Sequence, residues 1–151
     1  MRVYRIVDAQ GCGMYRPAGP GQNSLWNMAI GNCNSTYAEP DPHPSAHNDA
    51  GIARNWPEFA QRHGLRTLLG GIPSLYDMHY VLTHHRFGFG SLTQLRRWVF
   101  GVGWLQSMHE CGGVVQVYEV PEEHVLMGIC QVTFDSRCAE RLDDMCLLDL
   151  E

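Results

Sequence analysis

A long stretch near the N-terminus, from residue 11 to about residue 55, is poorly suited to long helices or strands. Proline recurs there among many glycine, asparagine and serine residues, at positions 17, 20, 40, 42 and 44. Proline lacks a backbone N–H, and the other three residue types favour turns. Only residues 24–30 predict a short helix. Loops of this length are uncommon in a compact domain and are usually functional or disordered. Trp26, Tyr37 and Trp56 indicate that this one is at least partly packed.

The remaining sequence alternates short predicted strands with short predicted helices. Pro57 at the start and Gly64 past the end delimit one helix. A capping-box pattern at Ser74 and Asp77 begins another. The predicted strands are residues 1–7, 84–89, 114–120 and 126–134, and the predicted short helices are residues 57–63 and 74–82.

Residues 91–110 give the clearest helical pattern. Ser91 and Gln94 fit a capping box, and apolar residues then recur at three- and four-residue steps. That stripe consists of Leu92, Leu95, Val99, Val102, Leu105 and Met108. Gly101 and Gly103 weaken the pattern, and Gly112 ends it. We expect one long amphipathic helix here.

The order of elements predicts an α+β fold with a mainly antiparallel sheet, one long amphipathic helix and a long N-terminal loop region. The strand at 126–134 is expected to run antiparallel to the strand at 114–120. The tail, residues 136–151, is compatible with a helix or with a strand at its end. Because domains average about 150 residues, residues 1–151 are expected to form a single domain.

Composition narrows the function classes. All 11 cationic side chains are arginine, so Schiff-base chemistry and a lysine-containing phosphate loop are excluded. The formal charge of −5 argues against general nucleic-acid binding but permits a basic protein partner. No apolar run reaches the roughly 18 residues that span a membrane, and the first residues lack the apolar core of a signal peptide. We therefore expect a cytoplasmic protein whose six cysteines are reduced thiols.

Three segments together suggest a nucleotide cleft. They are Val3-Tyr4-Arg5, the run from Phe87 through Phe89 to Ser91, and residues 115–119 ending at Glu119. An arginine can bind phosphate bidentately, a serine can orient a ribose, and a glutamate can stabilise positive charge that develops on a sugar carbon. In this arrangement the chain resembles the ADP-ribosyltransferase-like fold, which splits NAD in a cleft between two small sheets. The resemblance covers residues 1–7 and 84–134.

The resemblance implies a split sheet, NAD as cofactor and specific site residues. Glu119 and Ser91 would be catalytic, and Arg5, Tyr4, Phe89 and Arg86 would bind the cofactor. Gly90 and Leu92 flank Ser91 where the family has small hydroxyl residues, and Gln116 lies three residues before Glu119 rather than two. Gln131 is an alternative occupant of the glutamate position. The competing interpretation is that Arg5 and Glu119 form a cross-strand ion pair or are solvated.

Two other kinds of site are possible. Cys33, His43 and His47 lie in one loop and are ligand types that zinc favours, as are His84, His85 and Cys111 elsewhere. The prolines beside His43 oppose a helical ligand pair, no Cys-x-x-Cys pair occurs, and we assign no metal ligand from these residues. Cys12, between two glycines, is a candidate thiol nucleophile.

The sequence therefore supports three alternatives. The first is an NAD-dependent ADP-ribosyltransferase-like enzyme of phage or prophage type. The second is a non-catalytic binding protein of a phage or mobile element that inhibits a host defence complex, with acidic residues directed at a basic partner. The third is a small zinc-stabilised protein. The acidic residues in question are Asp41, Asp49, Glu122, Glu123, Asp143, Asp144, Asp149 and Glu151.

Overall fold

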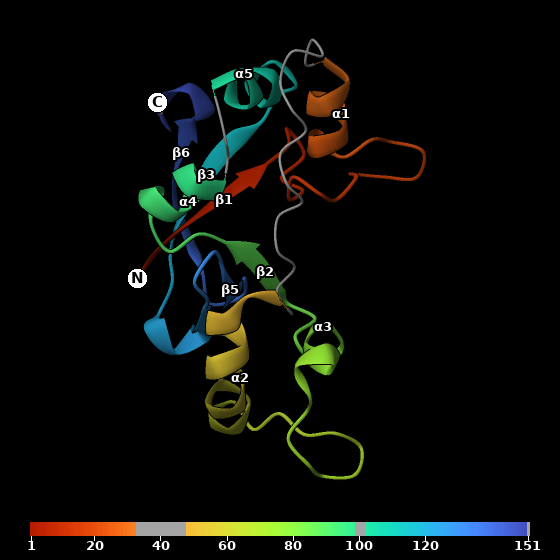
Figure 1. Ribbon diagram of the computed structural model, residues 1–151, viewed down its shortest axis with the longest axis vertical. Helices are drawn as coiled ribbons and strands as arrows, with labels where there is room; N and C mark the ends of the chain where they lie inside the picture. The colour runs from red at the N-terminus through yellow and green to blue at the C-terminus, as the bar shows by residue number, and fades with distance from the viewer. Residues whose placement is uncertain (33–47, 99–101, 151) are drawn as a thin grey trace.

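The computed structural model describes residues 1–32, 48–98 and 102–150 (Figure 1). Its strands are β1 (Arg2–Val7), β2 (His85–Gly88), β3 (Val114–Glu119), β4 (Val125–Met127), β5 (Val132–Asp135) and β6 (Glu140–Cys146). Its α-helices are α1 (Leu25–Asn32), α2 (Ala50–Arg62), α3 (Met78–Val81), α4 (Leu92–Trp98) and α5 (Val102–Glu110). Short 3-10 helices are η2 (Leu75–Asp77), η3 (Glu122–His124) and η4 (Leu147–Leu150).

The strands form two three-stranded antiparallel sheets (Figure 1). The strand order is β1-β3-β6 in the first sheet and β2-β5-β4 in the second. An isolated bridge joins the sheets, because Tyr4 and Phe89 exchange backbone hydrogen bonds of 2.8 and 2.7 Å. The predicted α+β fold with a mainly antiparallel, split sheet is therefore confirmed.

One core cluster lies between the first sheet and the helices α1, α4 and α5. It buries Leu25, Leu95 and Met108 of these helices against Ile6 and Val115 of the sheet. Since alternate residues of a strand share a face, Tyr4 and Ile6 define the helix-covered face of β1.

Two smaller clusters involve the second sheet. Ile52 and Trp56 of α2 pack against Leu126 of β4. Val3 of β1 packs with Phe134 of β5 between the two sheets. The first sheet thus meets helices on one face and the second sheet on the other.

The second helix begins earlier than the sequence predicted. It starts at Ala50 rather than Pro57, and Pro57 lies exposed in its interior. The reason is Asp49, whose carboxylate accepts hydrogen bonds from the backbone N–H groups of Gly51 at 2.9 Å and Ile52 at 3.2 Å. This N-cap outweighs the proline as the start signal.

The single strand predicted at 126–134 is wrong, because a turn divides it into β4 and β5. The backbone N–H groups of Ile129 and Cys130 in that turn each donate to the Asp49 carboxylate at 2.8 Å. The expected pairing with residues 114–120 is also wrong. β3 pairs with β1 and β6, and β5 pairs with β2 and β4.

The other expectations agree more closely. The helix predicted at 24–30 is α1, and the capping box at Ser74 is present. The tail pairs as a strand, β6, but this strand lies in the middle of the tail and η4 forms its end. The helical pattern of 91–110 corresponds to α4 and α5, with residues 99–101 outside the described part of the chain.

Candidate functional site

Arg5, the predicted phosphate ligand, lies on the face of β1 that meets the second sheet. Val3 shares this face and packs with Phe134 across the interface. The half-buried Arg5 side chain extends to Gly13, where an added Cβ would come within 2.6 Å of the guanidinium Nη2. A side chain at position 13 would therefore displace the guanidinium.

A tight turn after β1 creates this arrangement. The backbone N–H of Asp8 donates to the carbonyl of Cys12 at 2.9 Å, and the N–H of Cys12 donates to the Asp8 carboxylate at 2.8 Å. Gly11 adopts a φ of 80°, a conformation that favours glycine. The turn brings Gly13 back beside Val7, where the two form an antiparallel bridge.

Two more arginines act on Arg5, and we call Arg5, Arg16 and Arg86 the arginine cluster. The Tyr4–Phe89 bridge places Arg86 on the same side of the joined strands as Arg5. Burial lowers the pKa of Arg5, and the charges of Arg86 and Arg16 lower it further, against an opposing contribution from Tyr118. Within the described residues no salt bridge involves a member of the cluster. Positive charge therefore gathers here without a carboxylate partner.

The structure places the predicted catalytic residues elsewhere. Ser91 is exposed, and its Oγ accepts the backbone N–H of Gln94 at 3.0 Å as a cap of α4. Glu119 accepts a 2.6 Å bond from the N-terminal ammonium group. Arg5 pairs across the strands with Gln116, so Glu119, three residues further along, projects from the opposite face. Neither the predicted cleft of three side chains nor an Arg5–Glu119 ion pair forms.

The predicted aromatic ligands also lie away from the arginine cluster. Phe89 is buried and packs edge-on against Trp98, with ring centroids 5.4 Å apart. Tyr4 packs against the same core cluster. Gln131, the alternative to Glu119, is buried beside the start of β5. Of the predicted cofactor-binding residues, Arg5 and Arg86 share one side of the joined strands, and the Arg86 guanidinium donates to the backbone carbonyls of His85 at 2.9 Å and Thr83 at 3.4 Å.

A second group of polar side chains lies at the end of the second sheet away from the Tyr4–Phe89 bridge. His85 of β2 pairs directly with Asp135 of β5. Because Val125 pairs with Phe134, His124 lies next to Asp135 on the other side. The second sheet thus places a histidine on each side of one carboxylate.

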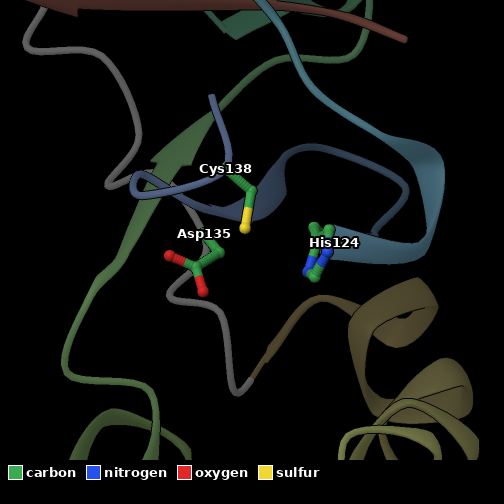
Figure 2. Close-up of side chains that lie close together, drawn as sticks. All are labelled: His124, Asp135 and Cys138. Carbon is green, nitrogen blue, oxygen red and sulfur yellow. The ribbon is translucent and has the colours of Figure 1, made fainter. Parts of the chain in front are cut away.

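A turn after β5 places a thiol beside these paired side chains. The backbone N–H of Cys138 donates to the carbonyl of Asp135 at 3.1 Å, which folds the turn back over the sheet. One ligand atom from each of His124, Asp135 and Cys138 lies within 4.8 Å of the others. Figure 2 shows the Cys138 sulfur between the carboxylate and the imidazole. We call these three residues the His-Asp-Cys group.

Asp135 is buried and charged. The Arg137 guanidinium holds the carboxylate through Nε at 3.0 Å and Nη2 at 2.6 Å. These bonds hold the pKa of Asp135 well below its usual range, although burial acts in the opposite direction.

Two other histidines surround the group. The Nε2 atom of His85 is buried and has no hydrogen-bond partner among the described residues. Burial lowers the pKa of His85 to about 4 despite the nearby charge of Asp135. The ring of His63 lies 5.4 Å from that of His124, and its Nε2 lies 2.6 Å from the carbonyl oxygen of Glu123.

Comparison with known proteins places the chain in a family. The family model described as Bacteriophage T4 Y00F protein matches residues 1–148. The chain belongs to this phage protein family. The comparison with curated proteins and the comparison with solved structures gave no match. The phage setting expected from the sequence is therefore confirmed, and the family description names no activity.

In this member of the Y00F family, the sequence prediction missed His124, Asp135 and Cys138. His124 lies between the predicted strands at 114–120 and 126–134, and Asp135 lies just past the second of them. Had that strand been recognised as a hairpin, its register would have placed His124 beside Asp135. The predicted metal candidates Cys33, His43 and His47 lie outside the described residues.

The remaining predictions on this Y00F-family chain concern thiols and membranes. Cys12, Cys111, Cys130, Cys138 and Cys146 are free thiols. Across the described ranges, no helix has the length and apolar character needed to cross a membrane.

Proposed function

We propose that the protein binds NAD through its pyrophosphate at the arginine cluster and transfers the ADP-ribose group to an acceptor. In this transfer the bond from the ribose to nicotinamide breaks, nicotinamide leaves, and the acceptor forms the new bond to the ribose carbon. The observation that carries the proposal is the environment of Arg5. Its guanidinium is half-buried, its pKa is lowered further by the charges of Arg86 and Arg16, and it has no carboxylate partner in the described part of the chain.

Such a cluster favours an anionic ligand. Burying a charge without a partner is unfavourable, and neighbouring like charges add to the cost. A pyrophosphate relieves both effects, because the planar guanidinium can donate two parallel hydrogen bonds to phosphate oxygens. The sequence has no lysine, so arginine is the side chain that can offer such an anion a positive charge that does not depend on pH in the physiological range.

The transfer step is supported by the resemblance of residues 1–7 and 84–134 to ADP-ribosyltransferases. Transfer needs a group that stabilises positive charge on the sugar carbon. Glu119, the sequence candidate, accepts the N-terminal ammonium on the opposite face of the sheet from Arg5. We therefore assign NAD binding to Arg5 and Arg86 and assign no role in binding to Glu119.

The test of this function is transfer from labelled NAD to host lysate proteins. The protein should incorporate label, and Arg5→Gln should lower incorporation by about 10-fold or more, since hydrogen bonds to charged groups contribute about 1.5–3 kcal/mol each. Arg2→Gln is the matched control, because Arg2 lies exposed on the same strand. Binding of NAD without incorporation of label would contradict the transferase activity but agree with the binding site. Absence of NAD binding would contradict both.

A second function is favoured by a different observation. Five large apolar side chains are exposed in the segment that joins α2 to β2, namely Leu68, Leu69, Ile72, Tyr76 and Tyr80. Where exposed apolar side chains lie together, the surface that they form is typical of protein-binding sites. This surface supports the alternative of a non-catalytic phage protein that inhibits a host defence complex.

A pull-down from host lysate separates the two modes of partner binding. Capture through this apolar surface should persist at high salt and be lost in a Leu68→Ser, Leu69→Ser variant. Capture through the exposed acids, such as Glu122 and Asp143, should fall steeply with salt. Capture that is unaffected by the double variant and by salt would contradict both modes.

A further inference from the structure

We propose that the His-Asp-Cys group binds a zinc ion. This site is independent of the proposed NAD site and lies at the opposite end of the second sheet from the Tyr4–Phe89 bridge. His124, Asp135 and Cys138 come from η3, the end of β5 and the turn before β6. Nitrogen, carboxylate oxygen and thiolate sulfur are the donor types that zinc takes in proteins.

The geometry comes close to a zinc site without rearranging the backbone. The three ligand atoms lie within 4.8 Å of one another. With bond lengths of about 2.0 Å to nitrogen or oxygen and about 2.3 Å to sulfur, two ligands at a tetrahedral angle lie roughly 3.5 Å apart. Rotations of the His124 and Cys138 side chains, both partly exposed, can close the remaining distance. The Asp135 carboxylate is already fixed in place by Arg137.

The surroundings of the group point to a ligand as well. His85 pairs with Asp135 across the strands, and its buried Nε2 atom lacks a partner among the described residues. A buried polar atom without a hydrogen bond is costly. Arg137, bound to the Asp135 carboxylate, is an outer partner of the kind that orients metal-binding carboxylates. Three protein ligands would leave a fourth zinc position for water.

Two alternatives fit the group less well. A Cys-His-Asp catalytic triad needs the carboxylate to accept an N–H from the histidine. Here the carboxylate takes its side-chain hydrogen bonds from Arg137 instead. Calcium and magnesium prefer sites made of oxygen atoms, whereas this group offers one sulfur and one nitrogen. Zinc is therefore the ion that suits these donors best.

Metal content of the full-length protein tests the proposal. After incubation with zinc chloride and removal of free metal, we expect one zinc per chain. Cys138→Ser and His124→Ala should lower zinc affinity by at least about 100-fold, because loss of even an outer-shell partner costs about 10–100-fold. Cys146→Ser is the matched control, since the Cys146 sulfur also lies beside a histidine, 3.6 Å from His109 Nδ1. It should keep the zinc.

Two readouts keep the test decisive if a variant fails to fold. In wild-type protein, zinc should protect Cys138 but not Cys146 from alkylation by iodoacetamide, measured peptide by peptide. Cobalt substitution should give a thiolate charge-transfer band that Cys138→Ser lacks. Wild-type protein without zinc, or equal alkylation of both thiols, would overturn the proposal. The proposal would also be overturned if Cys138→Ser retained zinc and Cys33→Ser lost it. Arg5→Gln should bind zinc normally, which separates this site from the NAD site.

Discussion

Asp49 is the residue on which the position of the second helix and the turn of the second sheet both depend. Its buried carboxylate accepts backbone hydrogen bonds from Gly51 and Ile52 at the start of α2. It also accepts them from Ile129 and Cys130 in the β4–β5 turn. Burial alone would raise the pKa of Asp49, but these donors outweigh it and hold the pKa below its usual range. A single ionised side chain thus joins two elements that lie far apart in the sequence.

This role makes stability dependent on pH. A carboxyl whose pKa is lower in the folded state stabilises the fold above its unfolded pKa of about 3.9, and this stability is lost as pH falls through the folded value. Asp49→Asn should lower the free energy of unfolding by roughly 2–4 kcal/mol at neutral pH, since several buried donors lose an ionised acceptor. It should also flatten the loss of stability in acid. Urea unfolding at neutral and acidic pH measures both effects. An equal loss in the exposed control Asp149→Asn would contradict this explanation.

Gly13 determines how the Arg5 guanidinium is held. A Cβ at this position would meet the flexible end of Arg5 rather than backbone. Gly13→Ala should therefore change stability by less than about 1 kcal/mol, within the range of surface substitutions. It should weaken binding of NAD, because it moves the guanidinium. Thermal unfolding with and without NAD checks both effects, and Gly19→Ala is the control, since its Cβ would make ordinary contacts. Full NAD affinity in Gly13→Ala would show that this placement is not needed.

At the scale of elements, α2 shows a conflict between local signals. Pro57 lies in the interior of the helix and cannot donate the backbone hydrogen bond that the helix needs there. The helix forms nevertheless because Asp49 caps it and because Ile52, Trp56 and Phe59 are buried. Tertiary contacts and the cap therefore overrule the proline.

Replacing that proline should stabilise the protein. Pro57 is exposed, so Pro57→Ala loses little packing and restores a donor in the helix. An interior proline costs about 3 kcal/mol, and the greater freedom of the unfolded chain offsets about 0.4–1 kcal/mol of the gain. We expect the free energy of unfolding to rise by roughly 2–2.6 kcal/mol. Denaturant titration checks this, with Gln61→Ala on the same helix as the control. A destabilised variant would mean that the proline ring has a packing role.

The sequence patterns predicted elements better than they predicted pairings. The strand β1, the helix α1 and the capping box at Ser74 follow from local residue preferences. The division of residues 126–134 into two strands does not, because it depends on the Asp49 carboxylate about 80 residues earlier. The partners of β3 likewise depend on contacts that no local pattern records.

The candidate sites show the same limit. Arg5 was found from its residue type and its place on a strand. The position of Glu119 was missed because the face of a strand residue follows from its register, here the pairing of Arg5 with Gln116. The His-Asp-Cys group was missed because its row of side chains arises from a hairpin register. Residue types suggested the chemistry, and tertiary pairing decided which residues meet.

At the scale of the whole molecule, the two sheets share one interface. Phe134 of the second sheet is 1% exposed and packs with Val3 and Val120 of the first sheet's side. The Tyr4–Phe89 bridge adds backbone hydrogen bonds across the same junction. This shared interface is the reason to expect that residues 1–151 unfold as one domain.

Phe134→Ala tests that expectation. Truncating a buried phenylalanine costs about 3–5 kcal/mol. If the sheets form one cooperative unit, the unfolding transitions measured by tryptophan fluorescence and by far-ultraviolet circular dichroism should shift by the same amount and remain coincident. Two separate transitions, one for each sheet, would contradict a single domain.

The most direct test of NAD binding at the arginine cluster is a calorimetric titration of NAD into the full-length protein and two variants. We expect NAD to bind to wild type and to Arg2→Gln with similar affinity. The affinity of Arg5→Gln for NAD should be about 10-fold or more lower, and the affinity of wild type should fall at high salt. Arg5 is a half-buried member of the arginine cluster, whereas Arg2 is exposed on the same strand. Equal NAD affinity in wild type and Arg5→Gln, or no binding of NAD at all, would contradict a nucleotide site at the arginine cluster.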